Sequence, residues 1–175
     1  GMLPMSGWTA ARFDFEKSGS MAQAVDGDGY GFKLGMTYKV SDALSIGATY
    51  HSETDMDDWS GDATMALYNG TSSIMSMDGT MTVTDFQWPS MLAVGIDFKA
   101  SEALREVAAV KHIGWEDVMA NFNMSFVTTS GGTMDITMPQ NWDNQTVIAL
   151  GVEYQSSPDV LLRAGYNSAD NPIQD

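Results

Sequence analysis

Residues 31–52, GFKLGMTYKVSDALSIGATYHS, alternate between apolar and polar side chains on both sides of a short break at Ser41, Asp42 and Ala43. A period of two is typical of a β-strand with one apolar face, because successive side chains point to opposite sides. A Ser-Asp break between two such runs is a turn signal. The segment therefore predicts an antiparallel hairpin with one apolar face.

The same hairpin pattern occurs three times along the chain. LGMTYKVSDAL begins at Leu34, VGIDFKASEAL at Val94 and LGVEYQSSPDV at Leu150. Each copy runs from an aliphatic-Gly-aliphatic start through an aromatic residue to a Ser-centred turn and a new strand. The repeats predict hairpins at 29–53, 90–117 and 143–168, with the long loops 51–88 and 112–142 at the other end. The predicted fold class is all-β, an antiparallel up-and-down meander in a single domain over residues 1–175.

One window, SEALREVAAV (101–110), has a helix-like composition but lies where the repeat requires a strand. We therefore predict a strand there. Its outward set is either Glu106, Ala108, Val110 and His112 or Val107, Ala109, Ile113 and Trp115. A β-bulge near Glu106 would reconcile the two registers.

Apart from the ambiguous strand that begins at Leu104, one face of the predicted strands carries no charge, although 18% of the chain is charged. A soluble β-sandwich core would show the same apolar face. Aromatic residues at the strand ends favour a membrane instead, because their rings suit the boundary between acyl chains and headgroups. We predict a transmembrane β-barrel wall with these lipid-interface aromatics: Tyr30, Tyr38, Tyr50, Phe98, Tyr154 and Tyr166.

The opposite face carries the charges and would face the barrel lumen, where charges pair with one another or meet water. Glu153 and Arg163 belong to strands that adjoin across the turn at 156–159, so we predict that they form an ion pair. The predicted lumen-facing polar residues are Lys33, Lys39, Asp97, Glu153 and Arg163.

Composition excludes several classes of protein. The net charge of −15 argues against nucleic-acid and anionic-lipid partners. The chain has no Cys, so disulfides and thiolate chemistry are excluded. No stretch of about 18 apolar residues is present to form a transmembrane helix.

Acidic residues crowd the segment HSETDMDDWSGD (51–62), which contains Glu53, and a solvated loop explains them best. A calcium site is the alternative, although the spacing lacks the Gly and Glu of a calcium-binding hand. The DGDG stretch at 26–29 is typical of a turn. The weak metal candidates are Asp55, Asp57, Asp58 and Asp62.

The two histidines, His51 and His112, have no Cys or second His nearby in the sequence to complete a metal site or a nucleophile-base pair. We therefore expect no enzyme activity and no cofactor. Methionines are frequent in the long loops, where thioethers suit either adaptable apolar ligand contacts or loop packing. They include Met56, Met65, Met75, Met77, Met81, Met119, Met124, Met134 and Met138.

Four segments resemble the FadL/TodX family of outer-membrane transporters for long-chain fatty acids and aromatic hydrocarbons. They are 26–52, 86–104, VKHIGWEDVMANF (110–122) and 141–175. The last two are the most specific, through the order of Trp115, Trp142, Arg163, Asn167 and Pro172. Residues 64–84 match poorly.

The resemblance implies a 14-stranded barrel of the Gram-negative outer membrane, plugged by an N-terminal hatch. Hydrophobic molecules would diffuse through it passively and leave sideways through the wall. Because hatch and closing strands are not recognisable here, we expect an internal piece of such a barrel, in contact with membrane lipid and a hydrophobic ligand. Its open faces or edges would promote self-association. The rival hypotheses are a soluble secreted β-sandwich or barrel for binding or adhesion, and a structural barrel without cargo.

Overall fold

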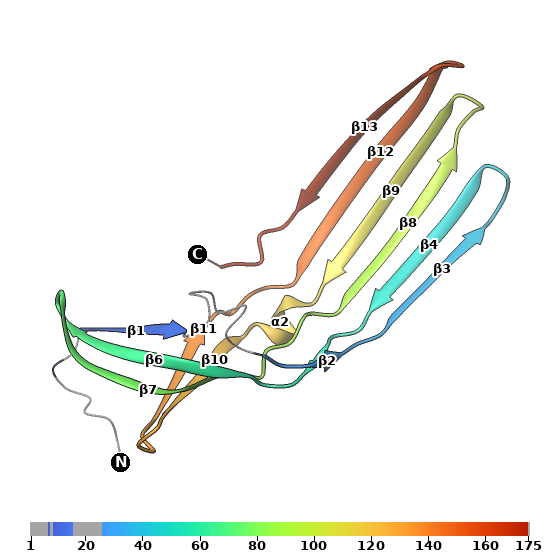
Figure 1. Cartoon of the computed structure of the whole chain (residues 1–175). Coiled ribbons are helices and arrows are strands. Elements are labelled where there is room, and N and C mark those ends of the chain that lie inside the picture. Colours follow the sequence, from blue (N-terminus) through green and yellow to red (C-terminus); the bar gives the residue numbers. More distant parts are fainter. Residues whose placement is uncertain (1–6, 8, 16–25, 175) are drawn as a thin grey trace. The chain divides into compact units, whose positions relative to one another are not determined.

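The computed structural model describes residues 7, 9–15 and 26–174, and these residues form two compact units. The first unit contains parts of 1–30, 55–86 and 121–140. The second contains 31–54, 87–120 and 141–175. Almost every element is an antiparallel strand (Figure 1). Among the described residues, no helix has the length and apolar composition needed to span a bilayer.

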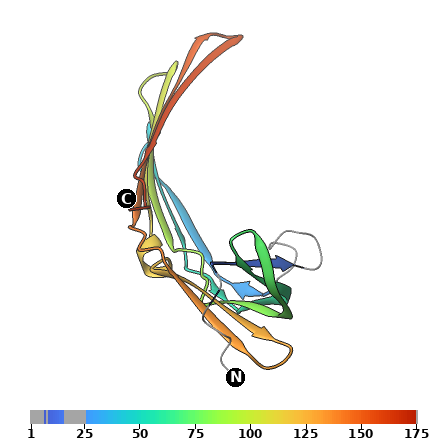
Figure 2. The same ribbon diagram turned by 90° about the vertical axis from the view of Figure 1, so that its left-hand side faces the viewer.

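The second unit is a six-stranded antiparallel sheet in the order β13-β12-β9-β8-β4-β3. Its strands appear edge-on in Figure 2 as one curved layer. Every neighbour in the sheet is paired antiparallel, as in an up-and-down meander. The strands are β3 Lys33–Lys39, β4 Leu44–His51, β8 Met91–Lys99, β9 Leu104–Ile113, β12 Gln145–Ser157 and β13 Val160–Ala169.

Two of the tight turns share one hydrogen-bond pattern. Ser41 Oγ accepts from the N–H groups of Ala43 and Leu44, at 3.2 and 3.1 Å. In the second repeat, Ser101 Oγ accepts from the N–H groups of Ala103 and Leu104, again at 3.2 and 3.1 Å. The Ser of these two repeats is therefore a turn-forming residue. The third turn differs, since β12 has a register shift between Gln155 and Ser157.

Residues 104–110 of the helix-like window lie in strand β9, as predicted. The predicted bulge near Glu106 is wrong, because β9 pairs with both β8 and β12 in an uninterrupted register through this residue. Glu106 lies opposite Phe98 on one side and Val152 on the other. Pairing with two regular neighbours therefore keeps the strand regular, and Glu106 is placed on the apolar face.

The short helix α2, Trp115–Val118, follows β9 directly. Asn144, just before β12, holds it in place: its Oδ1 accepts from the N–H of Glu116 at 3.1 Å, and its Nδ2 donates to Glu116 Oε2 at 2.9 Å. The reciprocal bonds join the end of β9 to the start of β12.

The first unit contains a five-stranded antiparallel sheet in the order β1-β6-β7-β10-β11 and a two-stranded ladder of β2 with β5. Segments 51–88 and 112–142, predicted as long loops, are therefore largely strand. The strands are β1 Ala10–Phe15, β2 Gly29–Tyr30, β5 Asp55–Met56, β6 Trp59–Asn69, β7 Ser72–Thr84, β10 Asn121–Thr128 and β11 Thr133–Pro139.

A methionine-rich core holds the five-stranded sheet together. Phe126 of β10 is fully buried, and its ring meets that of Phe13 on β1 edge to face, with centroids 5.6 Å apart. Since β6 and β7 lie between these strands, the sheet curls over its own inner face. The core residues are Ala63, Met65, Leu67, Met81 and Phe126, with Ala11, Phe13, Met77, Met124 and Met134 packed against them.

This core explains five of the nine loop methionines named above as packing residues, one of the two alternatives that their sequence positions left open. Met119 is also buried, in the second unit. Met75 and Met138 remain exposed. Thioethers fill an irregular, strongly curved interior well because their side chains are unbranched and flexible.

Candidate functional site

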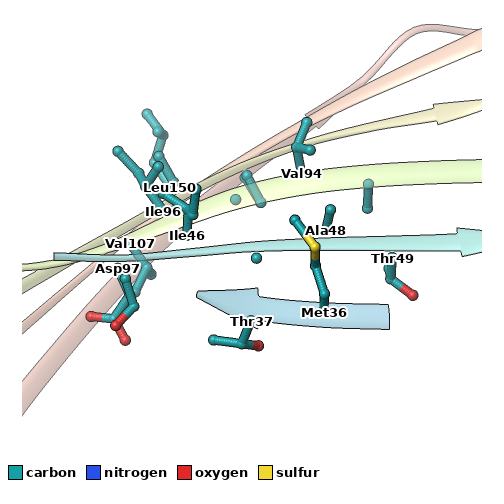
Figure 3. A pocket seen from close by; sticks show the side chains of 17 residues that line it. Met36, Thr37, Ile46, Ala48, Thr49, Val94, Ile96, Asp97, Val107 and Leu150 are labelled. Atoms are coloured by element: carbon teal, nitrogen blue, oxygen red, sulfur yellow. The ribbon is translucent and has the colours of Figure 1, made fainter. Parts of the chain in front are cut away.

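The six-stranded sheet separates its side chains by residue number. Up to the register shift at the end of β12, cross-strand partners pair odd with odd and even with even, for example Gly95 with Ala109 and Ile96 with Ala108. Even-numbered residues therefore share one face and odd-numbered residues the other. Figure 3 shows this division: Met36, Ile46, Val94, Ile96 and Leu150 point to one side, whereas Thr37, Thr49, Asp97 and Val107 point to the other. Because the hollow drawn there is lined from both faces of one layer, it is not an enclosed cavity.

The even-numbered face is apolar and uncovered. Leu34 is 63% exposed, and Val94 and Leu150 are each 50% exposed. No side chain in these six strands is buried. A β-sandwich would bury this face against a second sheet, so the structure does not favour the soluble rival. An apolar surface of this extent is typical of contact with lipid or another apolar partner.

Aromatic residues lie towards the ends of the strands on this face. Tyr38, Phe98 and Tyr154 are near the tight turns. Tyr50 and Tyr166 lie towards the opposite ends of β4 and β13. The arrangement is that of two aromatic belts flanking aliphatic residues.

Tyr30 lies elsewhere than the other five aromatics. It belongs to β2 in the first unit, and its hydroxyl donates a 2.5 Å hydrogen bond to Asp55 Oδ2. This bond, together with the negative charge of Asp55, raises the pKa of Tyr30 above its ordinary value of 10.0. Asp55 therefore acts as a hydrogen-bond acceptor.

Besides its tyrosines, the apolar face carries two ionisable side chains, both on β9. Glu106 lies between Phe98 and Val152, and His112 lies between Leu92 and Thr146. The sequence did not decide which face of the strand these two side chains occupy, because two registers were possible. The pairing of β9 with β8 and β12 decides it. Each is near an end of its strand.

The odd-numbered face carries ion pairs near the tight turns. Arg163 Nε lies 2.8 Å from Glu153 Oε2, so the predicted pair is confirmed. Arg105 forms two hydrogen bonds to Asp97, one of 2.8 Å from Nε to Oδ1 and one from Nη2 to Oδ2. Lys39 pairs with Asp42 at 2.6 Å within its own hairpin.

Arg105 and Lys111, both on β9, are charged residues of this face that sequence reasoning missed. Arg105 lies directly opposite Glu153, which in turn lies opposite Arg163. Charges of alternating sign therefore run from β9 to β13, and the diagonal ion pair with Asp97 extends them to β8, where Lys99 is the register partner of Arg105. The opposite charges of Arg105 and Glu153 are present in the sequence, but they indicate a contact only when the register of β9 is known.

Metal-site geometry is absent from the part of the chain that the structure describes, where no group of three or more His, Asp and Glu side chains converges. In the acidic segment, Asp58 Oδ1 accepts from the N–H of Asp85 at 3.3 Å, and Asp62 lies on β6. His51 and His112 lie on opposite faces of the sheet, because one is odd-numbered and the other even-numbered.

Comparison with known proteins places this geometry among outer-membrane channels. Residues 7–175 match the family model described as outer membrane protein transport protein (OMPP1/FadL/TodX). Outer membrane protein P1 of Haemophilus influenzae is 26% identical over 137 residues, which are 78% of this chain and 28% of that protein.

Two solved structures show the same fold. The toluene transporter TodX of Pseudomonas putida is 32% identical with a TM-score of 0.75, over 93% of this chain and 39% of that one. The CymD monoaromatic hydrocarbon channel is 25% identical with a TM-score of 0.80, over 95% and 44%. The chain thus spans less than half the length of each of these relatives.

Proposed function

Because the chain belongs to the outer membrane protein transport family (OMPP1/FadL/TodX), we propose that it forms part of a barrel wall through which hydrophobic small molecules cross passively. The chain is a protein of the Gram-negative outer membrane. Its even-numbered face would contact lipid and its odd-numbered face would line the lumen.

The observation that carries the proposal is the contrast between the two faces of the sheet. The even-numbered face has no Lys or Arg and exposes large apolar side chains such as Ile96. The odd-numbered face carries the ion pairs of Arg105 and Arg163. A cation at mid-membrane on a lipid-facing position costs about 2–4 kcal/mol, whereas the lumen tolerates charge. This asymmetry is what a transmembrane barrel requires.

The proposed cargo is a monoaromatic hydrocarbon or a long-chain fatty acid. TodX and CymD are named for toluene and for monoaromatic hydrocarbons, and this chain resembles both over most of its length. The middle of the odd-numbered face offers a low-relief wall, since Gly47, Gly95 and Ala149 lie in one cross-strand row. Apolar molecules would partition into such a passage without a chemical step, so we propose no enzyme activity.

Uptake by intact Gram-negative cells tests the proposal. Cells that produce the protein should take up radiolabelled toluene faster than cells without it, because the lipopolysaccharide leaflet slows the entry of hydrocarbons. Immunoblots of the outer-membrane fraction must show equal amounts of protein in each sample. Equal uptake rates with the protein present in the membrane would overturn the proposed transport function.

A further inference from the structure

Basic side chains are concentrated on the odd-numbered face of the six-stranded sheet. The whole chain has 8 Lys and Arg against 23 Asp and Glu. The strands of this face carry only two acids, Asp97 and Glu153. A strongly acidic protein therefore presents a basic wall here, which favours an anion. The cations on this wall are Lys33, Lys39, Lys99, Arg105, Lys111 and Arg163.

Four of these cations already have acidic partners. Lys39 pairs with Asp42 and Lys99 with Glu102, each across its own turn. Arg105 and Arg163 pair with Asp97 and Glu153, as described above. Within the described residues, Lys33 and Lys111 form no ion pair, and they are the two cations that an additional anion would neutralise.

Lys111 is the better placed of the two. It lies on the central strand β9, partly buried, between Ala93 of β8 and Val147 of β12. Its neighbours along the same face of its strand are Ala109 and Ile113. Lys33, by contrast, is exposed on the edge strand β3.

No acid shares the part of the odd-numbered strand face on which Lys111 lies. From the row of Gly95 and Ala109 to the ends of the strands away from the tight turns, the odd-numbered face carries no Asp or Glu. The ammonium group of Lys111 lies among small and apolar side chains, so a bound anion would give it a charge-assisted hydrogen bond. The small neighbours leave room for an apolar group beside it.

We propose that Lys111 binds the carboxylate of an amphipathic organic acid, with the apolar body of the acid lying over Ala93, Ala109 and Val147. One ammonium neutralises one carboxylate, whereas a phosphate dianion would leave a charge unpaired beside apolar groups. The inference rests on the proposed function and narrows it: this wall prefers an anion over a neutral hydrocarbon.

Equilibrium dialysis of the protein in lipid nanodiscs tests the inference with two probes of similar shape, 4-butylbenzoate and butylbenzene. Replacing Lys111 with Gln should weaken 4-butylbenzoate binding about tenfold, the loss expected for one charge-assisted hydrogen bond. Butylbenzene binding should change less than about twofold, since apolar burial scales with area and that area is retained. Lys111→Arg should retain the preference, and Lys33→Gln is the matched control for general charge on this face.

The outcomes separate this inference from the proposed function. Butylbenzene binding with equal 4-butylbenzoate affinity in the wild type and Lys111→Gln overturns the Lys111 site alone. An equal loss in Lys33→Gln also overturns it, because the effect would then belong to the whole face. If neither probe binds the wild-type protein, the proposed function falls together with the site. Urea midpoints of all variants must match, so that lost binding does not reflect unfolding.

Discussion

The indole rings of Trp115 and Trp142 meet edge to face, with centroids 5.1 Å apart and planes inclined by 70°. Trp115 begins α2, and Trp142 lies between β11 and β12. The backbone N–H of Trp142 also donates to the backbone carbonyl of Met119 at 3.2 Å, and Met119 is buried. The pair therefore fastens the segment after β9 to the segment before β12.

We expect the two tryptophans to be energetically coupled. A double-mutant cycle with Trp115→Leu and Trp142→Leu should give a coupling energy of about 1 kcal/mol, the value typical of an edge-to-face pair beyond its area of burial. Urea unfolding followed by circular dichroism measures it without relying on the removed fluorophores. Strictly additive losses would show that the ring contact contributes nothing of its own.

Gly79 permits the close approach of β7 to β10 in the first unit. A Cβ there would lie 2.2 Å from the carbonyl oxygen of Val127 and 2.8 Å from the ring of Phe126. Gly79→Ala should therefore destabilise the protein by about 3 kcal/mol, as overpacking of a rigid site does.

The matched control is Gly35→Ala in β3, where the nearest atom would lie at 3.7 Å, an ordinary contact. This change should alter the free energy of unfolding by less than about 1 kcal/mol. Urea denaturation of both variants measures the difference. Similar losses at the two positions would mean that steric contact at Gly79 is not the cause.

The Glu153–Arg163 pair should contribute only modestly. The side chain of Arg163 is 71% exposed, and that of Glu153 is 30% exposed. A double-mutant cycle with Glu153→Gln and Arg163→Gln should give about 0.5 kcal/mol, as for other solvent-accessible pairs. The coupling should largely disappear in about 1 M salt, where the screening length is about 3 Å. A coupling that persists at high salt would contradict this picture of an open, water-accessible face.

Met36 and Thr37 are neighbours on β3 that point to opposite faces. Met36→Lys should cost about 2–4 kcal/mol in lipid bilayers, because an ammonium on the lipid side is poorly solvated. Thr37→Lys should cost less than about 1 kcal/mol, since surface changes away from special features are small. Unfolding in vesicles compares the two. An equal cost for both variants would contradict the assignment of the even-numbered face to lipid.

Tyr30 should titrate at a higher pH than an ordinary tyrosine, because its hydroxyl donates to Asp55. A neutral phenol is the donor, so the contribution of this bond to stability is fully present below the ordinary pKa and is lost as pH rises through the raised value. In Tyr30→Phe, the absorbance change at 295 nm should lose the component that titrates above the ordinary tyrosine range. In Asp55→Asn the same tyrosine should titrate earlier; no change in Asp55→Asn would refute the cause given.

The strands of the second unit were predictable because alternation and turn chemistry are local. Leu34 and Tyr38 share a face whatever the rest of the chain does, since side chains in a strand repeat every two residues. Ser41 and Ser101 form the same turn because the hydroxyl bonds only the next few N–H groups. The Glu153–Arg163 pair was also predictable, because the two residues lie on strands joined by a single short turn.

Other features depend on residues distant in sequence. Glu106 was ambiguous until β8 and β12 fixed its register from both sides. Met65, Met81 and Phe126 stand in segments whose polar composition indicated loops, yet they form a buried core once the sheet of the first unit curls. β-Propensity depends on such neighbours. Local periodicity alone therefore specified the hairpins and their faces, whereas register, curvature and the isolation of Lys111 arose from strand pairing over long separations.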